Sequence, residues 1–458
     1  MMRSLYAGVS GLKTHQVKMD VIGNNIANVN TVAYKSSSVT FSELMYQTTQ
    51  SASGANAETG RAGINAKQIG LGVKSGAIST NISAEGATQN TGNPFDLQLN
   101  GSSFFVVSDG QSNYFTRAGA FTIDANGTLC MTTNGYNVMG WQADDEGNII
   151  KNTVSSLRVM SEANMISDPE ATTEGYMSGI IDKNDSQLTT GQITTLQFYD
   201  SKGYSYTMKF SITSTDAEGE YTMVASDIVD SSGTSILKNT DGTAMSAEDK
   251  KTKLAGYSLF DGAASYTMKY STTDGAWAGT ADGFTLNLTS LATDYDAALT
   301  KDVNVDLSST KNIDNDGTST INGNTGTLAN KAIGAGRAAG EMDSIAIQQD
   351  GKIIATYTNS VTKVLGQIAV ASFANASGLQ KEGDNLYSAT KNSGEFDGVG
   401  QDVTADGGSM ASGVLEMSNV DLSSEFTEMI TTQRGFQANS RIITVSDTML
   451  EELVNLKR

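Results

Sequence analysis

The sequence predicts a mainly β, multidomain protein with α-helical termini, in which the N- and C-terminal helices pair as a coiled coil around nested β domains. The 458 residues include 47 Gly and 2 Pro, a composition that suits strands joined by tight turns better than a helical bundle. Both ends of the chain show apolar residues that alternate at spacings of three and four, the pattern of a narrow helical seam. A β pattern begins near residue 93, stops near residue 165 and returns after residue 335, which indicates one domain inserted into another.

Residues 1–35 are expected to form the N-terminal helix of an inner core domain, which pairs with residues 414–458. Gln16 and Gly23 complete the register of its apolar seam, and several asparagines follow that glycine. Asparagine amides compete with the helix backbone for hydrogen bonds, so their number predicts close contact with neighbouring backbone or side-chain amides. A fraying helix end is the alternative explanation for the last of them.

The C-terminal helix is expected to begin after Asp421, a good N-cap residue, with Glu425 near the positive end of the helix dipole. Its seam is again apolar, with three polar members at the same spacing: Gln433, Ser440 and Asp447. Two such seams at opposite ends of one chain predict that the termini pack together.

The segment 36–92 is polar and weakly periodic, and we expect an extended linker region that could form strands once a partner surface is present. Residues 93–165 read as the first part of an inner β domain, because short apolar strands alternate with Asn-Gly and Asp-Gly turns. Residues 336–393 return to that pattern and are expected to complete the domain. A glycine-rich linker, 394–413, leads to the C-terminal helix.

Residues 166–335 differ in composition and are expected to form an inserted outer β domain. This segment holds 23 Asp and Glu against 11 Lys and Arg, so it carries most of the net charge of −20. Strand-like runs and Asp-Gly turns recur along it. We therefore expect a solvent-facing β domain.

The composition excludes several classes of function. An acidic chain without a basic stripe is a poor partner for nucleic acid, and no apolar run is long enough for membrane insertion. His15 and Cys130 are the only residues of their kinds, which excludes histidine-based triads, multi-histidine metal sites and an internal disulfide framework. The sequence predicts no catalytic, cofactor-binding or metal-binding residue, and we expect a protein that is not an enzyme, with Cys130 in a core.

One alternative of another class is a secreted glycan-binding or glycan-cleaving β protein. Paired carboxylates are plentiful, but sugar-binding clefts usually need aromatic platforms, and Trp141 and Trp277 are the only tryptophans. The helical seams also have no purpose in that alternative.

The segment from Gly23 to Thr31, followed by Tyr34 and Lys35, resembles the N-terminal signature of the flagellar rod, hook and hook-associated axial proteins. Ala33 departs from that signature, which usually has glycine before the aromatic residue. We expect the alanine to constrain the backbone at that turn more than glycine would.

The resemblance continues through the inner β segments and into the C-terminal pattern at residues 433–440, and it covers roughly 1–165 and 340–458. It implies a structural subunit that assembles with copies of itself into a curved, flexible tube, a universal joint between rod and filament. The large insert favours the hook over the distal rod, which is the alternative within the family.

The resemblance also implies which partners and surfaces to expect. The partners are other copies of the chain, the flagellar rod, the hook cap, the hook–filament junction and the type III export proteins, by which the chain reaches the extracellular flagellum without a cleaved signal peptide. Phe41 and Met45 match a short pattern that such substrates can present to the export gate. The terminal helices are expected to bury their seams against neighbouring copies through Leu5, Val9, Leu12, Met19, Ile22, Asn24, Asn25, Ile26, Asn28, Leu422, Phe426, Met429, Phe436, Asn439, Ile443, Leu450 and Val454.

Overall fold

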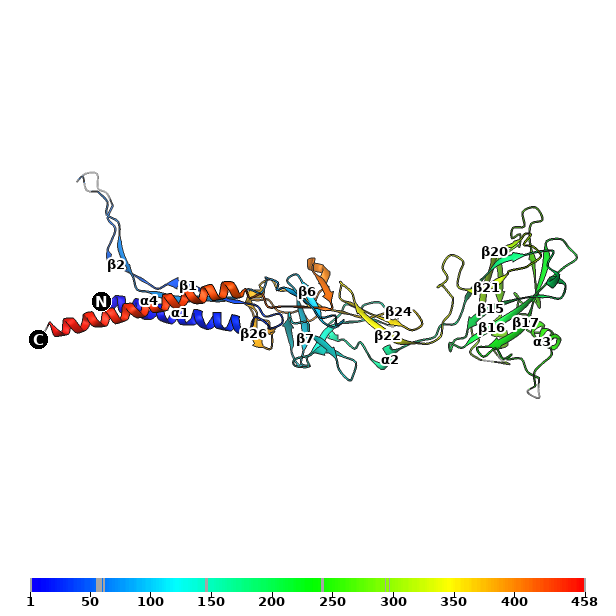
Figure 1. Ribbon diagram of the computed structural model, residues 1–458, viewed down its shortest axis with the longest axis horizontal. Helices are drawn as coiled ribbons and strands as arrows, with labels where there is room; N and C mark the ends of the chain where they lie inside the picture. The colour runs from blue at the N-terminus through cyan, green and yellow to red at the C-terminus, as the bar shows by residue number, and fades with distance from the viewer. Residues whose placement is uncertain are drawn as a thin grey trace. The chain divides into compact units, whose positions relative to one another are not determined.

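The computed structural model describes residues 2–54, 60, 62–144, 147–239, 243–292, 294–295 and 297–456. The chain divides into two compact units. The first unit comprises Met1–Asn164, Ser344–Ala355 and Lys363–Arg458, and the second comprises Met165–Asp343 and Thr356–Thr362. The second unit thus interrupts the sequence of the first, and both are built mainly of strands, as the sequence predicts (Figure 1).

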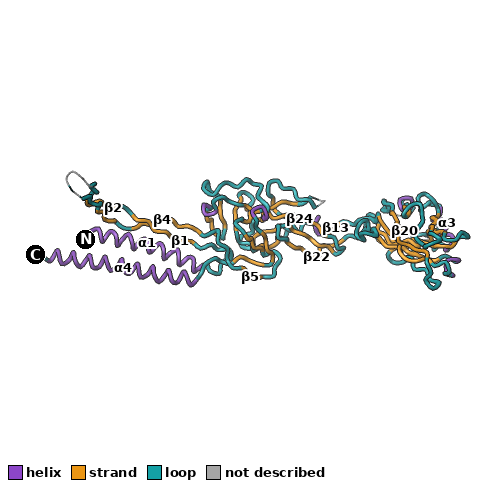
Figure 2. The backbone as a smooth tube through the Cα atoms, turned by 90° about the horizontal axis from the view of Figure 1, so that it is seen from above, coloured by secondary structure: helices purple, strands orange, loops and turns teal. Residues whose placement is uncertain are grey.

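The two long helices of the first unit are α1 (Met2–Ala27) and α4 (Leu422–Asn455), which lie side by side and antiparallel (Figures 1 and 2). Helix α4 begins where the sequence predicts, because the Asp421 carboxylate accepts a hydrogen bond from the Ser423 backbone N–H at 2.9 Å. This bond satisfies one of the N–H groups that a helix start leaves without a partner. The predicted pairing of the terminal helices is confirmed.

The segment expected as a linker forms a long two-stranded arm within the first unit. Strand β1 (Ser37–Glu43) pairs antiparallel with β4 (Val73–Thr80), and β2 (Tyr46–Gln50) pairs with β3 (Lys67–Gly70). Its strands pair with each other, so no partner surface is needed to form them. Strands β1 and β4 run alongside α1 (Figure 2).

The β domain of the first unit is a sheet whose central strands come from both sequence segments expected to form it. Within this unit the order is β24 (Thr362–Ile368), β11 (Asn137–Gln142), β7 (Phe104–Ser108), β8 (Asn113–Thr116), β27 (Leu386–Ser388) and β26 (Gln380–Gly383). Four short strands attach to this path: β9 (Phe121–Ile123), β10 (Leu129–Met131), β12 (Ser155–Ser156) and β25 (Val370–Ala371). Its core contains the fully buried Phe104, Phe115 and Trp141, and Cys130 is buried on β10.

The glycine-rich linker, and the residues before Asp421 in the range 414–458, differ from the prediction because they form strands. Strand β28 (Ser409–Ser412) pairs with β6 (Leu97–Asn100), and β29 (Val414–Glu416) pairs with β5 (Thr88–Asn90). The chain reaches β28 through the 3₁₀ turn Val403–Asp406 and Gly407, whose φ of 71° is a conformation that glycine adopts freely. These returning strands fasten the C-terminal segment to the β domain before α4 begins.

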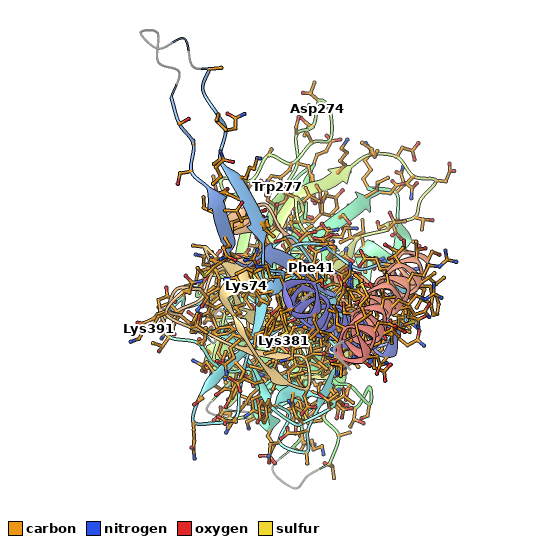
Figure 3. All side chains as sticks on the ribbon, turned by 90° about the vertical axis from the view of Figure 1, so that its left-hand side faces the viewer. Phe41, Lys74, Asp274, Trp277, Lys381 and Lys391 are labelled. Atoms are coloured by element: carbon orange, nitrogen blue, oxygen red, sulfur yellow. The ribbon has the colours of Figure 1, made fainter. Side chains whose placement is uncertain are left out.

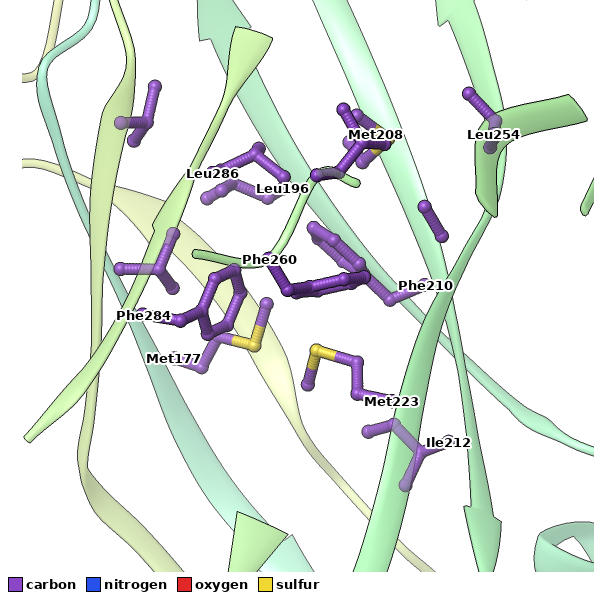
Figure 4. Packing of buried hydrophobic residues seen from close by; sticks show 14 of the residues in the cluster. Met177, Leu196, Met208, Phe210, Ile212, Met223, Leu254, Phe260, Phe284 and Leu286 are labelled. Atoms are coloured by element: carbon purple, nitrogen blue, oxygen red, sulfur yellow. The ribbon is translucent and has the colours of Figure 1, made fainter. Parts of the chain in front are cut away.

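The second unit contains two four-stranded sheets. The first has the order β15 (Gln192–Tyr199), β16 (Ser205–Ser214), β17 (Glu220–Asp230) and β18 (Ser265–Lys269). The second has the order β19 (Gly283–Leu286), β20 (Val303–Asn312), β14 (Glu174–Ile181) and β21 (Asn322–Thr325), in which β14 and β20 are parallel. One core draws apolar side chains from both sheets, including Phe210 opposite Phe284 and Met177 (Figure 4).

The remaining elements are short. Helix α3 (Ala247–Ala255) and the 3₁₀ turns Ser186–Thr189 and Leu288–Leu291 belong to the second unit, and the 3₁₀ turn Ala376–Gly378 belongs to the first. The residues at which the chain passes between units lie in or next to α2 (Glu162–Met165), β13 (Ile166–Ser167), β22 (Gly340–Ile347), β23 (Lys352–Tyr357) and the start of β24.

Candidate assembly surfaces

The contact between α1 and α4 is made largely by small residues. A Cβ added to Gly11 would lie 2.7 Å from Nδ2 of Asn439, and one added to Gly435 would lie 2.8 Å from Cε1 of His15. Either distance is shorter than real Cβ contacts allow, so these positions accept only glycine without movement of the neighbour. The two helix backbones therefore approach closely, and little room is left between them for large side chains.

The register of this contact differs from the predicted one by one residue. The buried positions of α1 are Gly8, Gly11, Thr14, Ile22 and Asn25, and those of α4 are Thr432 and Ser446. The predicted seam members Gln16, Gly23, Gln433 and Asp447 are instead exposed, and Ser440 is half-buried. The prediction was wrong on this point because it placed the largest apolar side chains at the centre of the seam, where the close approach requires small ones.

The predicted assembly residues divide into three groups by burial. Ile22 and Asn25 are buried within the chain. Half-buried residues border the helix contact: Leu5, Val9, Leu12, Met19, Ile26, Asn28, Met429, Phe436, Asn439, Ile443 and Leu450. Exposed residues are Asn24, Leu422, Phe426 and Val454, of which Phe426 is 49% and Val454 68% exposed. The helix pair thus leaves many of its larger apolar side chains partly or wholly uncovered.

Helix α4 carries a second apolar face that the sequence analysis missed, which we call the outer stripe. It consists of Ile442, Val445, Met449, Leu453 and Leu456, which are 43–81% exposed. Their spacings of three and four place them along a side of the helix that borders the residues facing α1, and Ile442 Cγ2 would lie 3.8 Å from a Cβ added to Gly8. A search for a second 3–4 series in the same segment would have found them.

The asparagines of the N-terminal signature are engaged within the chain. Asn25 donates to the Ser37 carbonyl at 2.8 Å and to Glu425 Oε1 at 2.9 Å, and its own oxygen accepts from the Tyr34 hydroxyl. Asn24 donates to that same hydroxyl at 3.1 Å. Burial raises the pKa of Glu425, although its hydrogen bond with Asn25 acts in the opposite direction. This network joins the end of α1 to the start of both α4 and the arm.

A buried ionic cluster lies where the helices meet the β domain. Lys35 Nζ is 2.7 Å from Glu416 Oε1, and both side chains are at most 1% exposed. Arg117 approaches the other carboxylate oxygen at 3.9 Å, and the Gly86 backbone N–H donates to Glu416 at 3.0 Å. Burial lowers the pKa of Lys35 more than the carboxylate raises it. The cluster ties together four segments that are far apart in the sequence, including Lys35 of the N-terminal signature.

Of the two residues of the predicted export motif, Phe41 lies within β1 and Met45 lies between β1 and β2 of the arm. The Phe41 ring packs edge-on against His15 of α1, with ring centroids 5.6 Å apart. Lys18 Nζ lies 6.0 Å from the centre of the same ring. Met45 is 72% exposed.

Within the described ranges, no three His, Cys, Asp or Glu residues are grouped as they would be around a metal ion. None of the helices described here is both long enough and apolar enough to cross a membrane.

Three family models match separate parts of the chain. Residues 5–35 match the model described as "Flagella basal body rod protein". Residues 98–167 match "Flagellar hook protein FlgE/F/G D1 domain", and residues 411–456 match "Flagellar basal body rod FlgEFG protein C-terminal". The matched segments include both helices and the first part of the β domain.

Curated relatives match the chain over its full length. The flagellar hook proteins FlgE of Treponema pallidum and Borreliella burgdorferi are 34% and 35% identical to it, with 100% of both chains covered in each case. The flagellar basal-body rod protein FlgG of Bacillus subtilis is 30% identical, again over 100% of both chains. The chain therefore belongs to the family of the flagellar hook proteins FlgE.

Proposed function

We propose that the chain is a structural subunit of the bacterial flagellar hook, which assembles with copies of itself into a curved, flexible tube that transmits torque from rod to filament. The observation that carries this proposal is the pair of terminal helices. Their contact with each other uses small residues, while the outer stripe and Phe426 remain exposed to solvent. Exposed apolar faces of this extent are typical of interaction surfaces.

The energetics favour assembly by many copies over a simple dimer. Fully burying one aliphatic side chain contributes about 1.5–3 kcal/mol, so covering the five half-exposed residues of the outer stripe contributes roughly 5 kcal/mol. Association of two molecules costs about 4–15 kcal/mol in lost freedom. One stripe thus offsets only the lower part of this cost, and assembly becomes more favourable when each copy contacts several neighbours.

The acidic second unit suits a tube that must bend. Its sequence segment carries an excess of 12 acidic residues, so copies of this unit repel one another and form no large apolar contact. Polar contacts that slide require no apolar interface to separate when the tube changes curvature. We expect bending to occur between second units while the terminal helices hold the tube together.

The proposed location and partners follow from the same assignment. We place the chain in the hook outside the cell, between the flagellar rod and the hook–filament junction, with the hook cap at the growing end. Export would use the flagellar type III apparatus without a cleaved signal peptide. Phe41 packs on His15 in the folded chain, so a gate that reads Phe41 and Met45 would do so before folding.

Substitution in the outer stripe tests the proposal directly. Val445 is 55% exposed, and Val445→Asp is expected to lower the polymerised fraction at least tenfold, because it places a charge in an apolar contact. Thr444→Asp is the matched control, since Thr444 is exposed next to it on a different side of the helix. Sedimentation and electron microscopy under polymerising conditions give the readout. Normal tubes from Val445→Asp would remove the assignment.

A further inference from the structure

An apolar hollow of about 420 Å³, which we call the socket, lies between the first half of α1 and the middle of the arm. It is lined by Tyr6, Val9, Leu44 and Met45, with Arg3 and Lys13 as its charged members. Tyr6 and Met45 are 63% and 72% exposed. In the described part of the chain, neither Arg3 nor Lys13 has an acidic partner within 4 Å.

The socket has a fixed shape because the arm is fastened to α1 beside it. The Val73 backbone N–H donates to the Ser10 hydroxyl at 3.2 Å. Leu44 and Leu71 continue the ladder across the arm, since Leu44 N–H donates to the Gly72 carbonyl at 2.9 Å. A preformed apolar hollow can receive a side chain without first ordering its own walls.

The end of α4, which we call the knob, lies opposite no residue of α1 in the described part of the chain. Gly11 faces Asn439 and, four residues further along each helix, His15 faces Gly435. These two pairs define the antiparallel register of α1 and α4. Continued to Met2, this register leaves the last turns of α4 beyond the start of α1 (Figures 1 and 2). The knob carries Leu453, Val454 and Leu456, which are 49%, 68% and 81% exposed.

We propose that the socket of one copy receives the knob of a second copy of this chain. The two surfaces agree in chemistry, since both are apolar and the charges on their described residues are opposite. Glu451 and Glu452 are the charged residues on the described part of the knob, and Arg3 and Lys13 flank the socket. Lys457 and Arg458 follow in the sequence outside the described residues.

The contact is heterologous, because the two copies use different surfaces. A head-to-tail contact of this kind does not close on itself in a pair, and its repetition generates a ring or an open helical filament. Each copy would offer its own knob to the next socket, so one contact would set the direction of growth. This inference rests on the proposed function and adds a specific partner surface to it.

A charge exchange tests the inference. Arg3→Glu makes the socket acidic like the knob, and Glu452→Arg makes the knob basic like the socket, so each variant alone is expected to lose at least tenfold in polymerised fraction. An equal mixture of the two variants restores opposite charges at every contact, and we expect at least half of the wild-type polymer. Lys74→Glu, an exposed charge change on β4 outside the socket, is the control and should polymerise normally (Figure 3).

Two results overturn the inference. One is normal polymerisation of Arg3→Glu alone. The other is failure of the mixture when circular dichroism shows that both variants are folded. Wild-type protein that polymerises, with Val445→Asp that does not, would leave the proposed function standing in either case. Wild-type protein that never polymerises would contradict the proposed function itself.

Discussion

The buried ion pair between Lys35 and Glu416 gives the most quantitative prediction. Lys35→Met keeps most of the side chain's volume but removes the ammonium group, which lies 2.7 Å from Glu416 Oε1 and 2.6 Å from the Ala84 carbonyl. Removal of one member of a buried pair costs about 3–5 kcal/mol, because the other charge is left without its partner. Arg117 and the Gly86 N–H still face Glu416, so we expect the lower end of that range, about 3 kcal/mol.

The matched control is Lys352→Met. Lys352 Nζ lies 2.8 Å from Asp350, nearly the same distance, but both side chains are at least 30% exposed. Exposed pairs contribute about 0–1 kcal/mol, so burial is the main variable between the two substitutions.

Chemical denaturation of the first unit measures the difference. Trp141 is buried in the first unit and Trp277 lies in the second, so a Trp277→Phe background confines tryptophan fluorescence to the unit under test. We expect Lys35→Met to lower the free energy of unfolding by at least 2 kcal/mol more than Lys352→Met, from the difference between buried and exposed pairs. Equal losses in the free energy of unfolding of the two variants would refute the reasoning that burial makes the ion pair between Lys35 and Glu416 important for stability.

Three further predictions concern the terminal segments. Ala33 is buried and has a φ of 54°, a left-handed conformation that strains any residue except glycine. Ala33→Gly is therefore expected to leave the free energy of unfolding unchanged or to raise it by up to about 1 kcal/mol, whereas the control Ala355→Gly on β23 should lower it. Equal losses of stability in chemical denaturation would contradict backbone strain at Ala33. Burial, and to a lesser degree the charge of Lys18, lowers the pKa of His15 below its usual value of 6.5. The unfolded chain therefore binds a proton that the folded chain does not, so the free energy of unfolding should fall as the pH drops through 6.5. The substitution His15→Gln should remove this pH dependence, and an unchanged pH profile in that variant would exclude His15 as its source. Gly11→Ala should weaken the contact between α1 and α4, because the added Cβ meets Asn439. In Gly23→Ala the added Cβ meets nothing within 4 Å, so this control should raise the helix content measured by circular dichroism. Equal changes in helix content in the two variants would contradict the close packing at Gly11.

The fold class and the start of α4 could be predicted because they depend on local signals. Glycine-rich turns, alternating apolar residues and the Asp421 cap act over a few residues, and each is visible in the sequence alone. The nested order of the two units also shows in the sequence, because the pattern of short apolar strands and glycine turns stops before an acidic segment and resumes after it.

The register of the helix contact could not be read in the same way. Side-chain size in the sequence favours Leu5, Leu12 and Met19 as the seam, but the contact is centred on Gly8 and Gly11. How closely two helices approach is a property of the pair, and only the facing residues of both helices decide it. For the same reason, strands β28 and β29 escaped detection, because their partners lie more than 300 residues earlier in the chain.

The central claim is that the outer stripe of α4 becomes an interface between copies. Electron cryo-microscopy of tubes grown from the purified wild-type chain tests it most directly, at a resolution that shows side chains. The account predicts that Val445 and Met449 are covered by a neighbouring copy. A tube in which both side chains remain exposed to water would contradict it.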